Sequence, residues 1–271
     1  MSGSDLHQLR NVGILGGTFD PVHHGHLIAA QWVLEALALD RVLFVPCFCP
    51  PHKPNGAIAT PGERLDMVTL ATSEDPGLEA SDVEVLRGGA SYTIDTVRHL
   101  KRQYPETRFV LIVGSDAFAE IVSWKEHERL LDEVRIVVMV RGGGLNLQRA
   151  ASNLPAELSR ELACAPMIEQ IDSASTAHGL DQTSQGRAAR LAVAKVPQIE
   201  ISSSEIRRRI GLRMSIQHLA PDAVQQYIRE KGLYEGIPQR PDRREREQGE
   251  REIPLCSPRR RPAANTKPKR E

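Results

Sequence analysis

Long apolar runs are missing from this sequence of 271 residues, although 40% of them are hydrophobic. No stretch approaches the roughly 20 apolar residues that a helix needs to cross a bilayer. Residues 1–10 lack the apolar centre of a secretory signal. The four cysteines are irregularly spaced and do not form the framework of a disulfide-stabilised domain. We therefore expect a protein of the reducing cytoplasm that does not enter a membrane.

A net charge is also missing, because 35 Lys and Arg balance 35 Asp and Glu. This excludes a global electrostatic preference for nucleic acid or acidic surfaces, and we expect no nucleic acid on the core domain. The balance is uneven, since residues 236–271 contain eleven Lys and Arg against six Asp and Glu. Proline and charge dominate that segment, and this composition is typical of a disordered tail.

Two nucleotide-binding signatures are absent. The sequence contains no GxxxxGK[ST] loop, and its GILGGTF segment is not a GxGxxG fingerprint. P-loop hydrolysis and hydride transfer are therefore unsupported. Cys47 and Cys49 lack the paired ligand spacing of structural zinc sites, so we expect no protein-bound metal.

Short apolar runs alternate with amphipathic segments along the chain. Strands are expected at 12–15, 41–45, 78–86, 109–113, 134–140 and 193–201. Helices are expected at 25–37, 63–73, 93–104, 154–164, 204–210 and 220–231. Continuous apolar runs such as FVLIV at 109–113 are typical of parallel strands buried on both faces. The alternation predicts a single catalytic α/β domain with a Rossmann-like, doubly wound parallel sheet.

The composition divides the chain into three parts. Residues 1–10 form an N-terminal lead, residues 11–235 the domain, and residues 236–271 the basic tail. Residues 173–186 are rich in Ser, Thr, Gly and Gln, and they make a long loop for a compact domain. We therefore interpret residues 142–190 as a loop insertion.

The segment 16–26 reads GGTFDPVHHGH and is the most informative stretch of the chain. It lies between the apolar run 12–15 and the amphipathic run 27–37, so we expect strand, glycine loop and helix. Glycines let a backbone approach a phosphate, and a helix N-terminus attracts negative charge. His23 and His26 can stabilise the charge that develops during phosphoryl chemistry.

A second motif, ISSSEIR, lies at residues 201–207. Serines at a helix start cap its N–H groups, and the same groups can bind phosphate. Arg207 lies one turn into the helix, where its guanidinium can bind two phosphate oxygens. Taken alone, the segment is equally typical of a capped helix with an exposed arginine.

With both motifs in this order, residues 10–235 resemble the HxGH nucleotidyltransferase superfamily, in particular bacterial nicotinate-nucleotide adenylyltransferases. Ser204 stands where the pattern usually has Thr, and it keeps the hydroxyl. The resemblance implies adenylyl transfer from ATP to nicotinate mononucleotide, which yields nicotinate adenine dinucleotide and pyrophosphate in NAD biosynthesis. It also implies Mg²⁺ carried by the ATP.

The resemblance further implies roles for individual residues. His23, His26 and Arg207 would act on the ATP phosphates and the transition state. Residues that would bind ATP are Gly16, Gly17, Thr18, Phe19, Gly114, Asp116, Ser202 and Ser203. Residues that would bind the mononucleotide are His52, Lys53, Thr93, Trp124 and Arg141. Gly142 replaces the proline of the family's Arg-Pro-Gly turn, so the loop shape there is open.

Alternatives remain within and outside this class. Nicotinamide mononucleotide is a possible second acceptor. Pantetheine-phosphate adenylyltransferases usually have Thr at the position of His23, and cytidylyltransferases usually end with a different motif. From another class, the alternative is a non-catalytic nucleotide sensor with a nucleic-acid-binding tail, although a sensor has no need of both imidazoles. The oligomeric state is not predicted.

Overall fold

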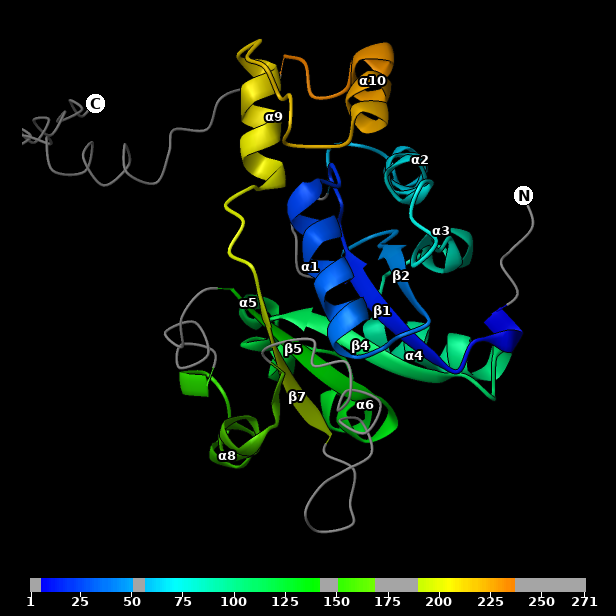
Figure 1. Ribbon diagram of the computed structural model, residues 1–271, viewed down its shortest axis with the longest axis vertical. Helices are drawn as coiled ribbons and strands as arrows, with labels where there is room; N and C mark the ends of the chain where they lie inside the picture. The colour runs from blue at the N-terminus through cyan, green and yellow to red at the C-terminus, as the bar shows by residue number, and fades with distance from the viewer. Residues whose placement is uncertain (1–5, 51–56, 142–150, 169–189, 237–271) are drawn as a thin grey trace, which may run out of the picture. The chain divides into compact units, whose positions relative to one another are not determined.

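A parallel sheet organises the computed structural model, which describes residues 6–50, 57–141, 151–168 and 190–236. In these residues seven strands lie in the order β3-β2-β1-β4-β5-β7-β6, and Figure 1 labels β1, β2, β4, β5 and β7. Their bounds are β1 Asn11–Gly17, β2 Arg41–Pro46, β3 Leu78–Ala80, β4 Arg108–Gly114, β5 Arg135–Arg141, β6 Met167–Ile168 and β7 Leu191–Val196. Every neighbouring pair is parallel.

Helices connect these strands, and all the elements belong to the unit Met1–Ile237. The α-helices are α1 His24–Ala36, α2 Pro61–Thr72, α3 Val83–Arg87, α4 Thr93–Gln103, α5 Ser115–Phe118, α6 His127–Glu133, α8 Ala156–Cys164, α9 Ser203–Gly211 and α10 Asp222–Lys231. Two 3₁₀ turns are η1 Leu6–Gln8 and η2 Ile121–Ser123. None of the described helices has the length and apolar character needed to span a bilayer.

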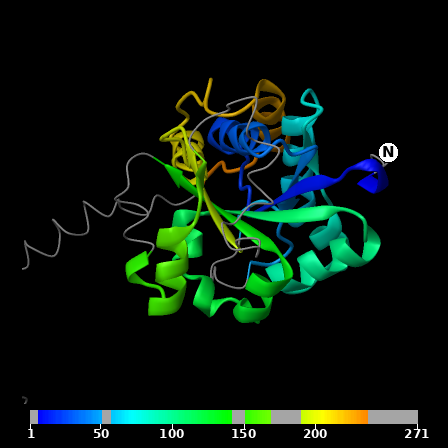
Figure 2. The same cartoon turned by 60° about the horizontal axis from the view of Figure 1, so that its bottom comes forward.

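The sheet has a hydrophobic core on each face, because successive strand residues point to opposite sides. On β1, Leu15 belongs to a core that includes residues of α1, α2, α9 and α10, whereas Ile14 belongs to one that includes residues of α4, α6 and α8. Figure 2 shows α1 and α10 on one side of the sheet and the green helices on the other. The prediction of a Rossmann-like, doubly wound parallel sheet is confirmed.

The chain order reverses between β1 and β4, since β1 pairs with β2 on one side and with β4 on the other. In doubly wound sheets, ligands bind outside the carboxyl ends of the strands at this reversal. Gly17 ends β1, Gly114 ends β4 and Arg141 ends β5. The fold therefore places three sequence-predicted site residues at the expected edge.

Two expected strands are corrected. Residues 78–86 form a strand only to Ala80, and residues 83–87 form α3, in which Val83 and Glu84 are buried while Leu86 is 77% exposed. Gly88, at φ +68°, ends that helix. The strand expected at 193–201 is β7, which begins at Leu191 and ends at Val196. Pro197 has no N–H to continue the ladder.

The segment interpreted as a loop insertion, residues 142–190, contains regular structure. The helix expected at 154–164 is observed as α8, and β6 pairs with β7 at the edge of the sheet. The helix was predicted, whereas the edge strand at Met167–Ile168 was not. The remainder, at 142–150 and 169–189, and the tail at 237–271 lie outside the described residues.

Candidate active site

The glycine loop between β1 and α1 is built around Phe19. Phe19 adopts φ +49° and is buried, and its ring covers Gly17. A Cβ on Gly17 would lie 2.8 Å from Phe19 Cζ, so glycine is required there. The Phe19 ring also meets the His26 ring edge-on, with centroids 5.1 Å apart. The Phe19 side chain therefore supports His26. Of the predicted ATP-site role of Phe19, only a contact through its backbone remains.

His23 and His26 stack on each other at the start of α1. Their ring centroids are 3.7 Å apart and the planes differ by 22°. The backbone N–H of His23 donates to Nδ1 of His26 at 3.3 Å. With Nδ1 accepting, the proton of a neutral His26 is on Nε2, where it can be donated to a ligand.

Gly25 explains the spacing of the two histidines. A Cβ at this position would lie 3.1 Å from His23 Nδ1 and 3.2 Å from its Cε1, with Ile199 Cγ2 at 3.7 Å. The His23 ring is confined between Gly25 and the His26 ring, so it cannot easily move aside. A glycine between the histidines is thus a packing requirement of the stacked pair.

His23 is uncharged at neutral pH. Only 3% of the residue is exposed, and burial lowers its pKa to about 4, with further lowering by the charges of Arg141 and His24. Its Nδ1 has no hydrogen-bond partner among the described residues. A buried ring nitrogen without a partner is costly, so this atom is a candidate contact for a ligand.

The lowered pKa of His23 predicts a pH-dependent stability. Below pH 6.5 the unfolded chain binds a proton at His23, whereas folded His23 stays neutral until about pH 4. The free energy of unfolding should therefore fall as the pH drops through this window, by up to about 3 kcal/mol. Urea unfolding at pH steps from 4.5 to 7.5 measures it. His23→Gln should lack this component, and an equal slope in wild type and variant would contradict it.

The second motif joins the first at the N-terminus of α9. Ser202 caps the helix by accepting the N–H of Glu205 at 3.1 Å. Ser203 Oγ donates to the Pro21 carbonyl at 2.8 Å. The Arg207 guanidinium donates to the Asp20 carbonyl and lies 3.8 Å from the Asp20 carboxylate. The start of α9 therefore contacts the glycine loop between β1 and α1, although the two segments are far apart in sequence.

Asp20 is a residue that the sequence reasoning missed, although it lies inside the quoted motif. Only 4% of Asp20 is exposed. Its carboxylate accepts the N–H of Ile58 at 2.8 Å, the N–H of Ala59 at 3.1 Å and the hydroxyl of Tyr234 at 2.9 Å. Asp20 thus ties the glycine loop to the segment before α2 and to the segment after α10. In the sequence, Asp20 stands out because it is an acidic residue in a loop whose glycines and histidines suit an anionic ligand.

Arg64 is a second missed residue, and only 1% of it is exposed. Its guanidinium donates to three carbonyl oxygens: that of Thr18 at 2.8 Å, of Phe48 at 3.2 Å and of Ala59 at 3.2 Å. These bonds join the loop after β1 to the loop after β2. In the sequence, Arg64 could have been noticed as a charged residue on the same helix face as Met67, which is buried.

Two of the predicted mononucleotide residues, Thr93 and Trp124, belong to segments that meet at the start of α4. The Phe48 N–H donates to Ser91 Oγ at 2.9 Å, so the loop after β2 reaches the segment before Thr93. Lys125, next to Trp124, lies 4.8 Å from the centre of the Tyr92 ring. The structure therefore brings the segments of Thr93 and Trp124 together. His52 and Lys53 lie outside the described residues.

Gly114, Asp116 and Arg141 lie at the carboxyl edge of the sheet. A Cβ on Gly114 would lie 2.6 Å from Asp116 Oδ1, so the carboxylate folds over the end of β4. Asp116 and Arg141 are both exposed. The charge of Arg141 acts on His23. With Gly16, Gly17 and Thr18 at the end of β1, the edge presents mainly hydrogen-bond donors and cations, which suits a polyphosphate.

Comparison with known proteins gives close relatives in sequence. Residues 14–209 match the family model described as cytidylyltransferase-like. The chain is 38% identical over 225 residues to a probable nicotinate-nucleotide adenylyltransferase of Citrifermentans bemidjiense, covering 82% of this chain and 97% of that protein. It is 36% identical over 223 residues to a protein of the same name from Thermus thermophilus, covering 82% and 98%.

Solved structures agree on the fold. Plasmodium falciparum nicotinic acid mononucleotide adenylyltransferase, complexed with NaAD, has a TM-score of 0.58 at 19% identity and covers 83% of this chain and 97% of that one. A putative nicotinate-nucleotide adenylyltransferase from Vibrio parahaemolyticus has a TM-score of 0.52 at 15% identity and covers 84% and 98%.

Proposed function

Because this chain belongs to the family of nicotinate-nucleotide adenylyltransferases, we propose that it transfers the adenylyl group of ATP to nicotinate mononucleotide. The products are nicotinate adenine dinucleotide and pyrophosphate, in NAD biosynthesis. The observation that carries this proposal is the stacked pair of His23 and His26, with Arg207 bound to the same loop through Asp20.

The chemistry needs little beyond alignment and charge. The phosphate of the mononucleotide is already ionised at neutral pH, so its attack on the α-phosphorus of ATP requires no strong base. His26 would donate from Nε2 to the phosphates, and neutral His23 would offer its unpartnered nitrogen. Arg207 would neutralise charge on the leaving pyrophosphate. Backbone amides at the start of α9 would bind the β- and γ-phosphates.

A divalent cation fits this site as a companion of ATP. The Asp20 carboxylate is already engaged by three donors. The described part of the chain contains no group of three His, Cys, Asp or Glu side chains arranged for a metal. The donor set therefore favours Mg²⁺ bound mainly by phosphate oxygens. When bound, the ion would neutralise polyphosphate charge.

The proposal places the enzyme in the cytoplasm. Among the described residues Cys47, Cys49 and Cys164 form no disulfide, which is compatible with a reducing compartment. A nucleotide sensor without catalysis would not require two stacked imidazoles at the carboxyl edge of the sheet. The stacked pair of His23 and His26 therefore favours an enzyme over a sensor.

Substrate choice tests the proposal. A carboxylate on the pyridine ring can accept hydrogen bonds from backbone N–H groups that a carboxamide satisfies less fully. We expect kcat/KM for nicotinate mononucleotide to exceed that for nicotinamide mononucleotide by more than about 10-fold, on the order of 1.4 kcal/mol. Steady-state kinetics with both substrates at saturating ATP measure this ratio. Equal efficiencies would reject the assignment of the acid as substrate.

A further inference from the structure

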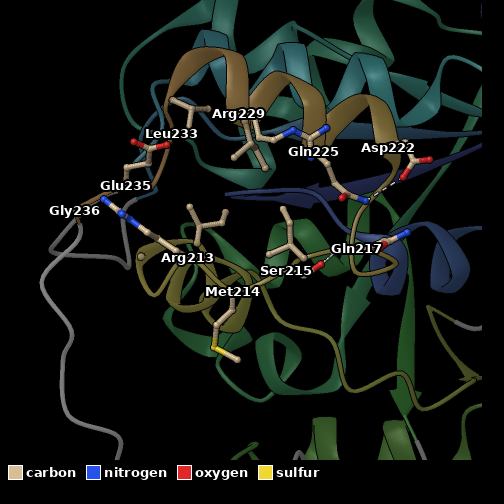
Figure 3. Close-up of a pocket in the computed structure, with 14 residues that line it drawn as sticks. Arg213, Met214, Ser215, Gln217, Asp222, Gln225, Arg229, Leu233, Glu235 and Gly236 are labelled. Carbon is tan, nitrogen blue, oxygen red and sulfur yellow. Dashed lines mark hydrogen bonds between the residues drawn. The ribbon is translucent and has the colours of Figure 1, made fainter.

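Tyr234 lies near the end of the described chain, but its side chain reaches the glycine loop between β1 and α1. It follows α10 and adopts φ +66°, an unusual conformation for a residue with a Cβ. Its neighbours Leu233 and Glu235 line a cavity of about 830 Å³ between α9 and α10 (Figure 3). Tyr234 itself is only 3% exposed and packs in the core. The backbone therefore turns this one side chain inward.

The Tyr234 hydroxyl has a defined partner. It donates to Asp20 Oδ1 at 2.9 Å, and Met67 Sδ lies 3.9 Å away. Burial raises the pKa of Tyr234 far above its ordinary value, and the charge of Asp20 raises it further. The hydroxyl thus stays protonated at every pH at which the protein works, and it is always a donor to the carboxylate.

Asp20 passes this contact on to the catalytic arginine. Its carbonyl accepts from the Arg207 guanidinium, and its carboxylate lies 3.8 Å from the same group. The other donors to the carboxylate, Ile58 and Ala59, are backbone N–H groups of the segment before α2. Without the Tyr234 hydroxyl, Asp20 Oδ1 would keep one donor at 3.1 Å, and the carboxylate could rotate toward Arg207.

We propose that Tyr234 is a positioning residue for adenylyl transfer, which acts through Asp20 on Arg207. The inference rests on the proposed function. Because the hydroxyl is buried against Asp20 and Met67, it would act by setting where the guanidinium lies when the pyrophosphate leaves. Its loss should lower kcat more than it raises either KM, because the Arg207 contact strengthens in the transition state.

Tyr227 provides a matched control. Its hydroxyl donates to Asp66 Oδ2 at 2.7 Å, so it makes a Tyr–Asp hydrogen bond that is exposed and joins α10 to α2 without contact to the glycine loop, whereas the bond of Tyr234 is buried. Tyr227→Phe removes a hydroxyl from α10, and Tyr234→Phe removes one from the segment that follows it. Tyr234→Phe should lower kcat by about 5- to 20-fold, with each KM within about 2-fold. Tyr227→Phe should leave kcat within about 2-fold.

The experiment is a double-mutant cycle in the full chain, with kcat measured well below the melting temperature of each variant. In an Arg207→Ala background, Tyr234→Phe should cost less than about 2-fold, because no guanidinium remains to be positioned. Asp20→Asn replaces Tyr234→Phe in the cycle should that variant not fold. Equal kcat losses in both backgrounds, or a Tyr234→Phe enzyme like Tyr227→Phe, would overturn the inference. A wild-type protein without activity would instead reject the proposed function.

Discussion

His26→Ala should lower kcat by roughly 10²- to 10⁴-fold and leave the fold intact. The imidazole lies at the carboxyl edge of β1, and its Nδ1 is fixed by the backbone N–H of His23. The proton on Nε2 is therefore oriented before ATP binds, and orientation of this kind stabilises the transition state without reorganisation. Removal of the ring removes that donor. His23→Ala should give a loss in the same range, because it also removes the surface on which His26 stacks.

His24 is the control for this prediction. It belongs to the same turn and is half-buried, but its ring stacks on neither neighbour among the contacts of the described residues. His24→Ala should keep kcat within about 3-fold of wild type. Steady-state kinetics of the three variants, with circular dichroism to check folding, decide the matter. Near-normal turnover of His26→Ala would show that the assigned mechanism is wrong.

Arg64→Ala should destabilise the protein by about 3–5 kcal/mol. The substitution leaves the carbonyls of Thr18, Phe48 and Ala59 without their donor and opens a cavity under the glycine loop. Each unsatisfied buried acceptor is costly, and the loss of a large buried side chain adds to this. Chemical unfolding at pH 7 measures the change in free energy.

Arg98→Ala is the matched substitution on the surface. Arg98 pairs with Glu126 and Glu133, so it has at least as many charged partners as Arg64. These ion pairs are solvated, and pairs of this kind contribute little to stability. The loss should be much smaller than for Arg64→Ala. Similar losses in the two variants would mean that burial of the Arg64 guanidinium does not determine its contribution.

The sequence predicts the elements that depend on local pattern. The strand, loop and helix around segment 16–26 follow from an apolar run, glycines and an amphipathic run, and the structure has them as β1 and α1. The start of α9 follows from Ser202, which caps it as expected. Segment 78–86 was ambiguous, because a short run with alternating charge fits both a strand and α3.

The contacts that organise the site were not predictable in the same way. Asp20 meets Ile58 across 38 positions and Tyr234 across 214. No periodicity or cap encodes such pairs, because they arise only when the sheet brings its loops together. For the same reason a buried Arg64 reads as an ordinary charge on an amphipathic helix. Only the resemblance to the family implied that the motifs at 16–26 and 201–207 lie close together.

The most direct test of the account is a product analysis of the purified full chain with Mg²⁺, nicotinate mononucleotide and either ATP or CTP. We expect nicotinate adenine dinucleotide and pyrophosphate in equal amounts with ATP, at least about 10-fold less product with CTP, and loss of product in His26→Ala. Equal turnover of CTP, or pyrophosphate without the dinucleotide, would contradict it.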